Sequence, residues 1–384
     1  MLLVRGARLA TLLIVPAFAL VACGGGSEPE AGETPDPAPT ESTSTPSPSE
    51  TTSPSESPTP QRSARPRVIG TVARNLEVPW GIAFLPDGTA LVTERDSGRV
   101  FQVGRGQVDE VGQVEEAEAE GEAGLLGIAV SPSFERDRRV FLYATAAEDN
   151  RVFRTTFENG RLGRLRPILT GIPKASNHDG GRIIFGPDGW LYVATGEAGQ
   201  PELAQDMGSL GGKILRIGQD GEPAEGNPDR SSPIWTSGHR NVQGLAFDHE
   251  GNLWASEFGQ NTWDELNLIQ RGFNYGWPQV EGKGGDGARF TDPQVQWRTE
   301  DASPSGLAFV RDRLYLGALR GERVWRIDVA GKSASNDRGF FVGEYGRMRT
   351  VVAAPDGNLW VTTSNRDGRG DPADTDDRIL LVRP

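Results

Sequence analysis

The sequence predicts an all-β protein built as a six-bladed β-propeller, and three observations support this prediction. A hairpin of two short strands recurs six times along the chain. Its copies lie about 43 to 63 residues apart, which leaves room for roughly four short strands in each unit. The 384 residues include 50 glycines and 27 prolines, as is typical of turn-rich chains, and strong helical periodicity is absent.

Each copy of the hairpin consists of a strand, a tight turn and a second strand. The turn often reads Pro-Asp-Gly, because Gly and Asp tolerate the positive φ angles of such turns. The six copies begin at Gly81, Gly127, Arg182, Gly244, Gly306 and Val351. A seven-bladed propeller and a β-sandwich are the alternatives, although the chain supplies no seventh copy. Loops at one end of the blades of a propeller converge on its axis, so we expect the functional site there.

The first 22 residues have the order of a secretory signal peptide. Arg5 and Arg8 precede an apolar run over residues 9–21, which is too short to span a membrane as a helix. Cys23, the only cysteine, follows this run directly after a small residue and resembles the acylated cysteine of a bacterial lipobox. We therefore expect an exported lipoprotein anchored by lipidated Cys23 to the outer face of the cell membrane. A secretory peptide with an incidental cysteine is the alternative.

Residues 23–66 are expected to form a disordered linker that begins with the lipidated cysteine. The segment is rich in Pro, Ser and Thr, and residues 35–60 contain no aromatic or large aliphatic side chain that could build a core. The propeller is therefore expected to occupy residues 67–384. The formal net charge of −13 disfavours nucleic acid as a partner.

The stretch over residues 177–197 holds the first candidate catalytic pair. His178 lies just before the first strand of the third hairpin, and Glu197 lies just after the second strand. If the strands pair around residues 187–189, both side chains come out at the same edge of the sheet. An imidazole oriented by a carboxylate is the arrangement that a general base requires.

Several further motifs follow one another along the chain. They are residues 177–182 (NHDGGR), 205–216 (QD followed by GKILR), 238–244 (GHRNVQG), 274–278 (NYGWP) and 346–349 (GRMR). Together they resemble the soluble glucose and aldose sugar dehydrogenases that use pyrroloquinoline quinone (PQQ), over about residues 68 to 382. The resemblance implies a six-bladed propeller that oxidises an aldose, or a related alcohol, to a lactone or ketone with PQQ and calcium.

The resemblance also implies which residues are catalytic. His178 would take the proton of the sugar's anomeric hydroxyl as hydride leaves C1 for PQQ, and Glu197 stands where the family usually has Asp. Arg240 would stabilise the charge that develops on the quinone oxygens. Of the other two histidines, His239 is expected to pack inside the fold and His249 to be exposed in a hairpin turn.

PQQ carries three carboxylates and two adjacent carbonyls, so its site needs cations and hydrogen-bond donors. The implied cofactor-binding residues are Arg240, Asn241, Gln243, Arg320, Arg347 and Arg349. Family members typically have a lysine at the position of Arg320 and an acidic residue at that of Ser364. Glu122 falls at a substrate-side polar position of the family, but it also ends an acidic run typical of a solvated loop.

Residues 257–265 resemble the calcium loop of the family. Calcium takes several oxygen ligands, often main-chain carbonyls together with carboxylates. The resemblance assigns the carbonyls of Gly259 and Gln260 to an ion that bridges to PQQ. It assigns Glu265, the Tyr275 carbonyl and Asp286 to a second, structural ion.

Two other functions are open at this point. One is a calcium-dependent propeller lactonase, in which a metal held by side-chain carboxylates and amides activates water. The other is a non-catalytic propeller that binds a carbohydrate or a protein at the cell surface. The expected partners of an oxidoreductase are a sugar and an electron acceptor of unspecified kind. We expect a monomer or weak dimer that reaches the membrane through its lipid alone.

Overall fold

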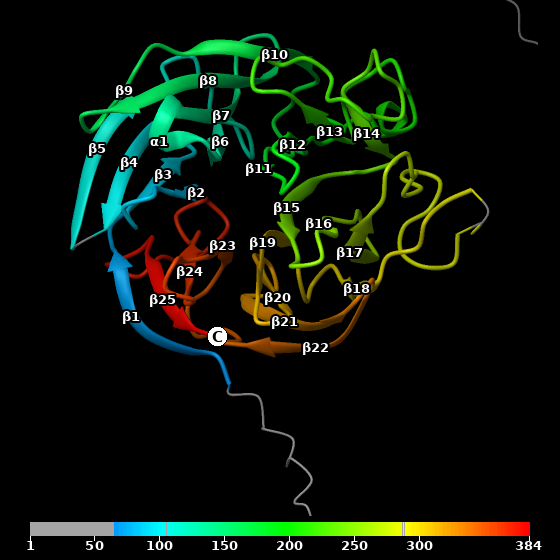
Figure 1. Cartoon of the computed structure of the whole chain (residues 1–384). Helices are drawn as coiled ribbons and strands as arrows, with labels where there is room; N and C mark the ends of the chain where they lie inside the picture. Colours follow the sequence, from blue (N-terminus) through cyan, green and yellow to red (C-terminus); the bar gives the residue numbers. More distant parts are fainter. Residues whose placement is uncertain (1–64, 105, 286, 288) are drawn as a thin grey trace, which may run out of the picture. The chain divides into compact units, whose positions relative to one another are not determined.

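Six antiparallel β-sheets are arranged in a ring around a common centre, as Figure 1 shows. This computed structural model describes residues 65–104, 106–285, 287 and 289–384. The predicted signal peptide, Cys23 and the predicted linker up to residue 64 therefore lie outside the described residues. The prediction of an all-β, six-bladed fold is confirmed.

The first three blades each contain four main strands, and blade 2 has one extra short strand. Blade 1 consists of β2 (Pro79–Phe84), β3 (Ala90–Glu94), β4 (Arg99–Gly104) and β5 (Gln107–Gln113). Blade 2 consists of β6 (Leu125–Val130), β7 (Arg139–Thr145), β8 (Asn150–Glu158) and β10 (Arg166–Ile172), with β9 (Arg161–Leu162) paired to β8. Blade 3 consists of β11 (Ile183–Phe185), β12 (Leu191–Ala194), β13 (Lys213–Ile217) and β14 (Ile234–Ser237).

The last three blades repeat the four-stranded plan. Blade 4 consists of β15 (Val242–Phe247), β16 (Leu253–Glu257), β17 (Trp263–Ile269) and β18 (Val295–Arg298). Blade 5 consists of β19 (Pro304–Val310), β20 (Arg313–Ala318), β21 (Arg323–Ala330) and β22 (Ser333–Phe340). Blade 6 consists of β23 (Met348–Ala353), β24 (Leu359–Thr363), β25 (Ile379–Arg383) and β1 (Arg67–Ala73).

Blade 6 joins the beginning and the end of the folded chain. Its strand order is β1-β25-β24-β23, so that β1, the first strand in the sequence, is the outermost strand of the last blade. The pairing of β1 with β25 is antiparallel and runs from Arg67 opposite Arg383 to Ala73 opposite Ile379. It closes the ring by hydrogen bonds between strands at opposite ends of the folded chain.

The six predicted hairpins are the first two strands of the six blades, and their first strands lie nearest the centre of the ring in Figure 1. In blade 3, Ile183 pairs with Val193 and Phe185 pairs with Leu191. The tight turn lies at one end of this hairpin. The segments before β11 and after β12 therefore emerge together at the other end, as predicted.

Apolar side chains fill the space between neighbouring blades. Between blades 2 and 3, Phe141, Tyr143, Ile183 and Leu215 belong to one cluster and are at most 1% exposed. Burying one such side chain is worth about 1.5–3 kcal/mol. This packing fixes each blade against the next, and so fixes the loops that the blades carry.

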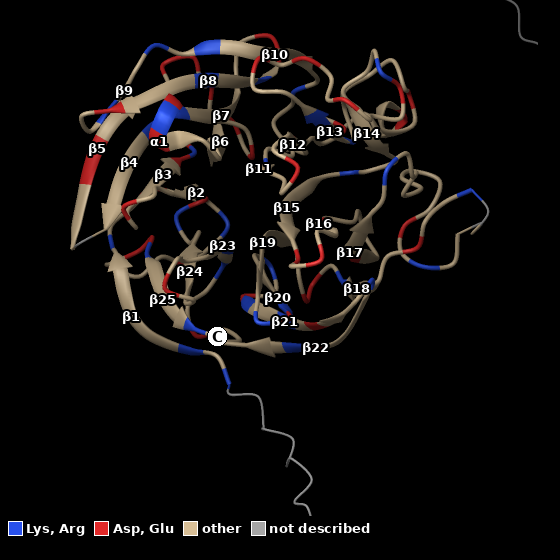
Figure 2. Ribbon diagram, in the orientation of Figure 1, with Lys and Arg blue, Asp and Glu red and all other residues tan. Residues whose placement is uncertain are grey.

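Helical structure is minor in the described part of the chain. It consists of α1 (Phe134–Asp137) and the short 3₁₀ helix η1 (Pro201–Ala204). Among the residues that the structure describes, no helix has the length and apolar character needed to cross a membrane. Basic and acidic residues are interspersed around the ring of blades, as Figure 2 shows.

Candidate functional site

His178 and Glu197 form a hydrogen-bonded pair at the end of the β11–β12 hairpin. The distance between His178 Nδ1 and Glu197 Oε1 is 2.9 Å. The His178 side chain is 14% exposed, and that of Glu197 is 1% exposed. His178 has a φ of 58°, a left-handed conformation that is uncommon outside glycine and often marks functional sites. The predicted pairing of these two residues is confirmed.

The carboxylate determines how the His178 ring is used. Because Glu197 accepts a hydrogen bond, Nδ1 carries the proton and Nε2 keeps its lone pair. Nε2 lies 3.3 Å from the side-chain nitrogen of Asn177. The second carboxylate oxygen of Glu197, Oε2, is buried without a hydrogen-bond partner among the described residues. The pair thus has the geometry of an oriented general base.

Glu122 connects the loops of three blades around His178. Its Oε2 accepts hydrogen bonds from the His178 main-chain N–H at 3.3 Å and from Asn241 Nδ2 at 3.4 Å. The Asn241 Oδ1 atom in turn accepts from the Gly180 N–H at 3.0 Å. Burial tends to raise the pKa of Glu122, but the nearby charges of Arg369 and His178 outweigh it and lower the pKa. Glu122 is therefore an ionised carboxylate beside the predicted base.

Arg240 is a largely buried cation with unused hydrogen-bonding capacity. Its Nη1 donates a long hydrogen bond of 3.4 Å to the Phe258 carbonyl, and its guanidinium lies 5.4 Å from the Trp277 ring centre. Its Nε is buried without a partner among the described residues. Burial lowers the pKa of Arg240, while the charge of Glu197 among others raises it. Such a cation is poised to receive an anionic or carbonyl oxygen.

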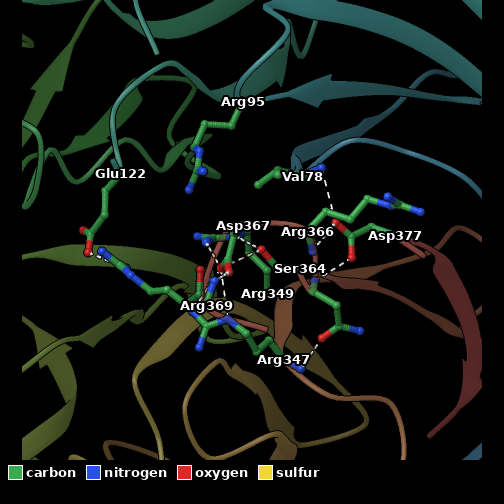
Figure 3. A network of polar contacts seen from close by, with 12 residues as sticks. Val78, Arg95, Glu122, Arg347, Arg349, Ser364, Arg366, Asp367, Arg369 and Asp377 are labelled. Atoms are coloured by element: carbon green, nitrogen blue, oxygen red, sulfur yellow. Dashed lines mark hydrogen bonds and ion pairs between the residues drawn. The ribbon is translucent and has the colours of Figure 1, made fainter. Parts of the chain in front are cut away.

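Two arginines, Arg347 just before β23 and Arg349 on β23, converge on one carboxylate, Asp367 (Figure 3). Arg347 Nη2 lies 3.0 Å and Arg349 Nη2 lies 3.5 Å from Asp367 Oδ2. The Arg349 Nε atom also donates to Ser364 Oγ at 3.0 Å. Asp367 is only 2% exposed and is an acid that the sequence analysis missed. Asp367 stands three residues after Ser364, and the position of Ser364 is the one at which the family typically has an acidic residue.

Gln243 extends this network toward the centre of the ring. Its Oε1 accepts hydrogen bonds from Arg349 Nη1 at 3.3 Å and from Ser305 Oγ at 3.0 Å. Its main-chain carbonyl accepts from Arg182 Nε at 2.8 Å. Blades 3, 4, 5 and 6 thus contribute to one buried cluster. Among the described residues, Asp367 is the only carboxylate that pairs with Arg347 and Arg349, and the buried Arg182 pairs with none.

Arg369 crosses from blade 6 to blade 2. Its Nη1 lies 3.1 Å from Glu122 Oε1, although the two residues are 247 positions apart in the sequence, and Figure 3 shows the two side chains reaching toward each other. Arg369 is 55% exposed, so solvent weakens this ion pair. The pair connects the loop that carries Asp367 with the surroundings of His178.

The predicted calcium loop is organised by an acid that the sequence analysis missed, Glu281. Its Oε1 accepts main-chain N–H groups of four successive residues, 260–263, at 2.8–3.1 Å. Gly259, Glu265 and Tyr275 line one small pocket together with Glu281. Glu265 and Tyr275, predicted for the structural ion, therefore come together, and Gly259, predicted with Gln260 for the other ion, lines the same pocket. Asp286 lies outside the described residues.

Among the described residues, the carboxylates of Glu257 and Glu265 are buried beside this pocket, and neither forms an ion pair with a Lys or Arg side chain. Glu265 accepts hydrogen bonds from the Gly282 N–H at 2.7 Å and from Asn267 Nδ2 at 3.0 Å. Burial and the nearby charge of Glu257 raise the pKa of Glu265 well above its ordinary value. A bound cation would relieve this repulsion. In the described part of the chain, no three His, Cys, Asp or Glu side chains form a metal-binding group, so main-chain oxygens are needed as ligands.

The remaining predicted residues fall in different places. Arg320 is exposed just after β20 and makes no contact with the arginine cluster in the described structure. His239 is fully buried, hydrogen-bonded to Glu257 at 2.8 Å and stacked on Tyr275, as expected. His249 is 65% exposed, also as expected. The repeat could have revealed Glu257, because it ends β16 near the position that Glu197 has after β12.

Comparison with known proteins places the chain among sugar-oxidising enzymes. A family model described as Glucose / Sorbosone dehydrogenase matches residues 76–381. The chain is 33% identical over 330 residues to the aldose sugar dehydrogenase YliI of Escherichia coli (strain K12), which covers 76% of this chain and 89% of the relative. It is 33% identical over 249 residues to quinoprotein glucose dehydrogenase B of Acinetobacter calcoaceticus, with coverage of 55% and 52%.

Among solved structures, the chain is similar to the PQQ-bound form of aldose sugar dehydrogenase from Streptomyces coelicolor. The TM-score is 0.81 at 50% sequence identity, and the match covers 83% of this chain and 98% of the other. The similarity thus extends over nearly the whole propeller.

Proposed function

The chain belongs to the glucose/sorbosone dehydrogenase family, and we propose that it is a PQQ-dependent dehydrogenase that oxidises an aldose, or a related alcohol, to a lactone or ketone. The observation that carries the proposal is the His178–Glu197 pair, which offers a base close to the partly unsatisfied cation of Arg240. Oxidation of an alcohol removes one proton and one hydride, and it therefore requires a base close to a group that stabilises negative charge on the hydride acceptor.

The charges of the site suit an anion with several carboxylates. Among the described residues, Arg347 and Arg349 share one carboxylate, Asp367, and the buried Arg182 pairs with none, which leaves an excess of positive charge. The orphaned Nε of Arg240 is a further donor. Arg240, Asn241, Gln243, Arg347 and Arg349 would hold PQQ, and Arg320 would have to reach the cofactor from its exposed position.

His178 removes the hydroxyl proton in this proposal. When bound, PQQ supplies an acceptor for the hydride that leaves C1 of the sugar. The hydroxyl proton passes to Nε2 of His178, so the substrate loses one proton and one hydride and a C–O double bond forms. Glu197 stabilises the resulting imidazolium through its hydrogen bond to Nδ1. Arg240 stabilises negative charge that develops beside it.

We also propose that the structural calcium ion binds beside Glu265 and the Tyr275 carbonyl, which line one pocket. The support is the buried carboxylate of Glu265, whose neighbour Glu257 disfavours a second negative charge in the absence of a cation. The carbonyls of Gly259 and Gln260 would bind the other predicted ion, which would contact PQQ. The calcium would fix the loop between β16 and β17, whose Phe258 carbonyl accepts a hydrogen bond from Arg240.

The export and lipid anchoring of the protein remain a proposal from the sequence. The support is the order of charged residues, apolar run and Cys23 at the N-terminus. Cys23→Ala is expected to abolish incorporation of labelled fatty acid and to release the protein from the membrane fraction. Unchanged fractionation of this variant would contradict the anchor.

The function is tested by loading the purified protein with PQQ and calcium and adding aldoses in the presence of an artificial electron acceptor. We expect the acceptor to be reduced in proportion to the sugar consumed, with lactone as the product. Failure of the protein to bind PQQ would refute the proposal. Lactone hydrolysis without PQQ would instead favour the lactonase alternative, and sugar binding without turnover would favour a binding protein.

A further inference from the structure

One position of the repeated hairpin is glycine in four of the six blades, where it lies against the next blade near the centre of the ring. A Cβ atom on Gly81 would come within 2.7 Å of the Leu126 carbonyl oxygen, and one on Gly306 within 2.6 Å of the Val351 nitrogen. Counted from the tight turn, the position is occupied in the six blades, in order, by Gly81, Gly127, Arg182, Gly244, Gly306 and Thr350, the last of which directly precedes Val351. Blades 3 and 6 are therefore the two exceptions.

The two exceptional residues contact each other. Arg182 Nη2 donates a hydrogen bond to Thr350 Oγ1 at 3.1 Å. Blades 3 and 6 are opposite each other in a ring of six, so the arginine side chain spans the centre of the ring. Thr350 Oγ1 in turn donates to the Trp80 carbonyl in blade 1. Four glycines thus leave the space that one long side chain fills.

Arg182 is a buried charge without a carboxylate partner among the described residues. It is 6% exposed, and its Nε donates to the main-chain carbonyl of Gln243 at 2.8 Å. Its guanidinium lies 4.3 Å from the ring centre of Trp80. A carbonyl, a hydroxyl and an aromatic face offset only part of the cost of burying a full charge. No carboxylate of the described residues therefore neutralises the charge of Arg182.

A second buried arginine lies on the other side of Gln243. Arg349 donates to the Gln243 side chain at 3.3 Å, while Arg182 donates to its main chain. Burial and the charge of Arg349 lower the pKa of Arg182 to about 9. Repulsion between these cations is relieved when an anion binds close to them. A side chain that only filled the space at the centre of the ring would need neither a positive charge nor Arg349 close to it.

We propose that Arg182 is a positioning residue for the anionic cofactor. Its guanidinium fixes Gln243 and Arg349 from the centre of the ring and supplies positive charge that is neutralised when the carboxylates of the cofactor bind. This inference rests on the proposed function, in which the cofactor is PQQ. Arg182 would thus act on the cofactor from the centre of the ring, whereas His178 and Arg240 act from the loops at one end of the blades.

The test compares Arg182→Gln with Arg182→Lys in the full chain. The first variant removes the charge, and the second keeps it without the planar fork. PQQ affinity is measured by equilibrium dialysis with calcium present, and the melting temperature of the PQQ-free protein is measured in parallel. We expect Arg182→Gln to bind PQQ about 10- to 100-fold more weakly and Arg182→Lys to stay within about 5-fold of the wild type.

The two kinds of failure are distinguishable. If the wild type binds no PQQ, the proposed function fails. If the wild type binds PQQ and Arg182→Gln binds it equally well, the role of Arg182 fails while the function stands. If Arg182→Gln lowers the melting temperature of the PQQ-free protein but leaves its affinity for PQQ unchanged, Arg182 only fills the space at the centre of the ring.

Thr350→Val provides a second variant in case Arg182→Gln does not fold. It removes the hydroxyl that accepts from Arg182 Nη2 and donates to the Trp80 carbonyl, but it keeps Arg182 and its charge. We expect PQQ binding about 3-fold or more weaker than in the wild type, because Arg182 loses one of its fixed partners. Unchanged affinity in this variant would overturn the positioning role.

Discussion

Two histidine–glutamate pairs with almost the same geometry lie in neighbouring blades of this propeller. His178 is hydrogen-bonded to Glu197 at 2.9 Å in blade 3, and His239 is hydrogen-bonded to Glu257 at 2.8 Å in blade 4. In each pair the histidine precedes the first strand of a hairpin; Glu257 ends the second strand of its hairpin, and Glu197 lies just after the second strand of its own. The distance between the two side chains therefore does not distinguish a catalytic pair from a structural one.

The second ring nitrogen and its exposure make the difference. His239 is fully buried, stacks on Tyr275, and has its Nε2 2.9 Å from Thr236 Oγ1. His178 is 14% exposed, and its Nε2 makes a longer hydrogen bond, 3.3 Å, with the side-chain nitrogen of Asn177. A histidine whose two nitrogens are both engaged in the interior has no lone pair for a substrate. The same pair is thus structural in blade 4 and available for chemistry in blade 3.

Replacing the two histidines should give the largest contrast between the pairs. His178→Gln is expected to lower kcat about 10²- to 10⁴-fold, because it removes the base and leaves the fold and PQQ binding intact. His239→Gln is expected to lower the melting temperature by several degrees, because it leaves buried partners unsatisfied. Steady-state kinetics and calorimetry on both variants measure the contrast. Equal kinetic losses at both positions would contradict it.

The two glutamates should show a smaller contrast of the same kind. Glu197→Gln is expected to lower kcat about 100-fold, because a neutral amide stabilises the imidazolium less than a carboxylate. Glu257→Gln should mainly destabilise the protein, because Glu257 accepts hydrogen bonds from His239 and from the Arg240 N–H.

Glu197→Asp is the matched conservative variant. It preserves the charge and should recover most of the kcat that Glu197→Gln loses, because aspartate is the usual residue of the family at this position. A loss as large as that of Glu197→Gln would show that the 2.9 Å contact depends on side-chain length and not on charge alone.

Calcium should stabilise the region around the buried pair of blade 4. We expect calcium to raise the melting temperature of the PQQ-free wild type in a concentration-dependent way, because only the folded state brings the ligands together. Glu265→Gln should lose most of this shift. Glu300→Gln, a change at an exposed position, is the matched control and should keep it. Equal shifts in all three proteins would show that Glu265 is not a ligand.

The smallest expected effect concerns the surroundings of the exposed pair. Burial raises the pKa of Asp179, next to His178, to about 6 from an ordinary 3.8, although hydrogen bonds from Asn150 and the Ala175 N–H oppose the shift. The folded state holds this proton to higher pH than the unfolded state, so the contribution of Asp179 to stability is complete below pH about 4 and is lost as pH rises through about 6.

Asp179→Asn should therefore flatten this part of the stability profile. Melting temperatures between about pH 4 and 7 measure the change, and Asp374→Asn, at an exposed position, serves as the control. A wild-type slope that persists in Asp179→Asn would assign it to another group.

The sequence by itself determined the repeated hairpins and the pair at the end of the third. Both depend on local order: strands alternate, Asp-Gly turns close them, and a hairpin returns to its start, so His178 and Glu197 meet although 19 residues separate them. The family motifs added the arginines of blade 6 and the calcium loop. The same local reasoning would have shown Glu257, had the hairpin ends been compared across blades.

The tertiary structure alone decided the contacts that cross the ring. Arg182 reaches Thr350 over 168 residues, and Arg369 reaches Glu122 over 247. Strand β1 closes the last blade, and Asp367 rather than Ser364 supplies the acid between two arginines. No local periodicity encodes such contacts, because each depends on the angle at which packing sets one blade against the others.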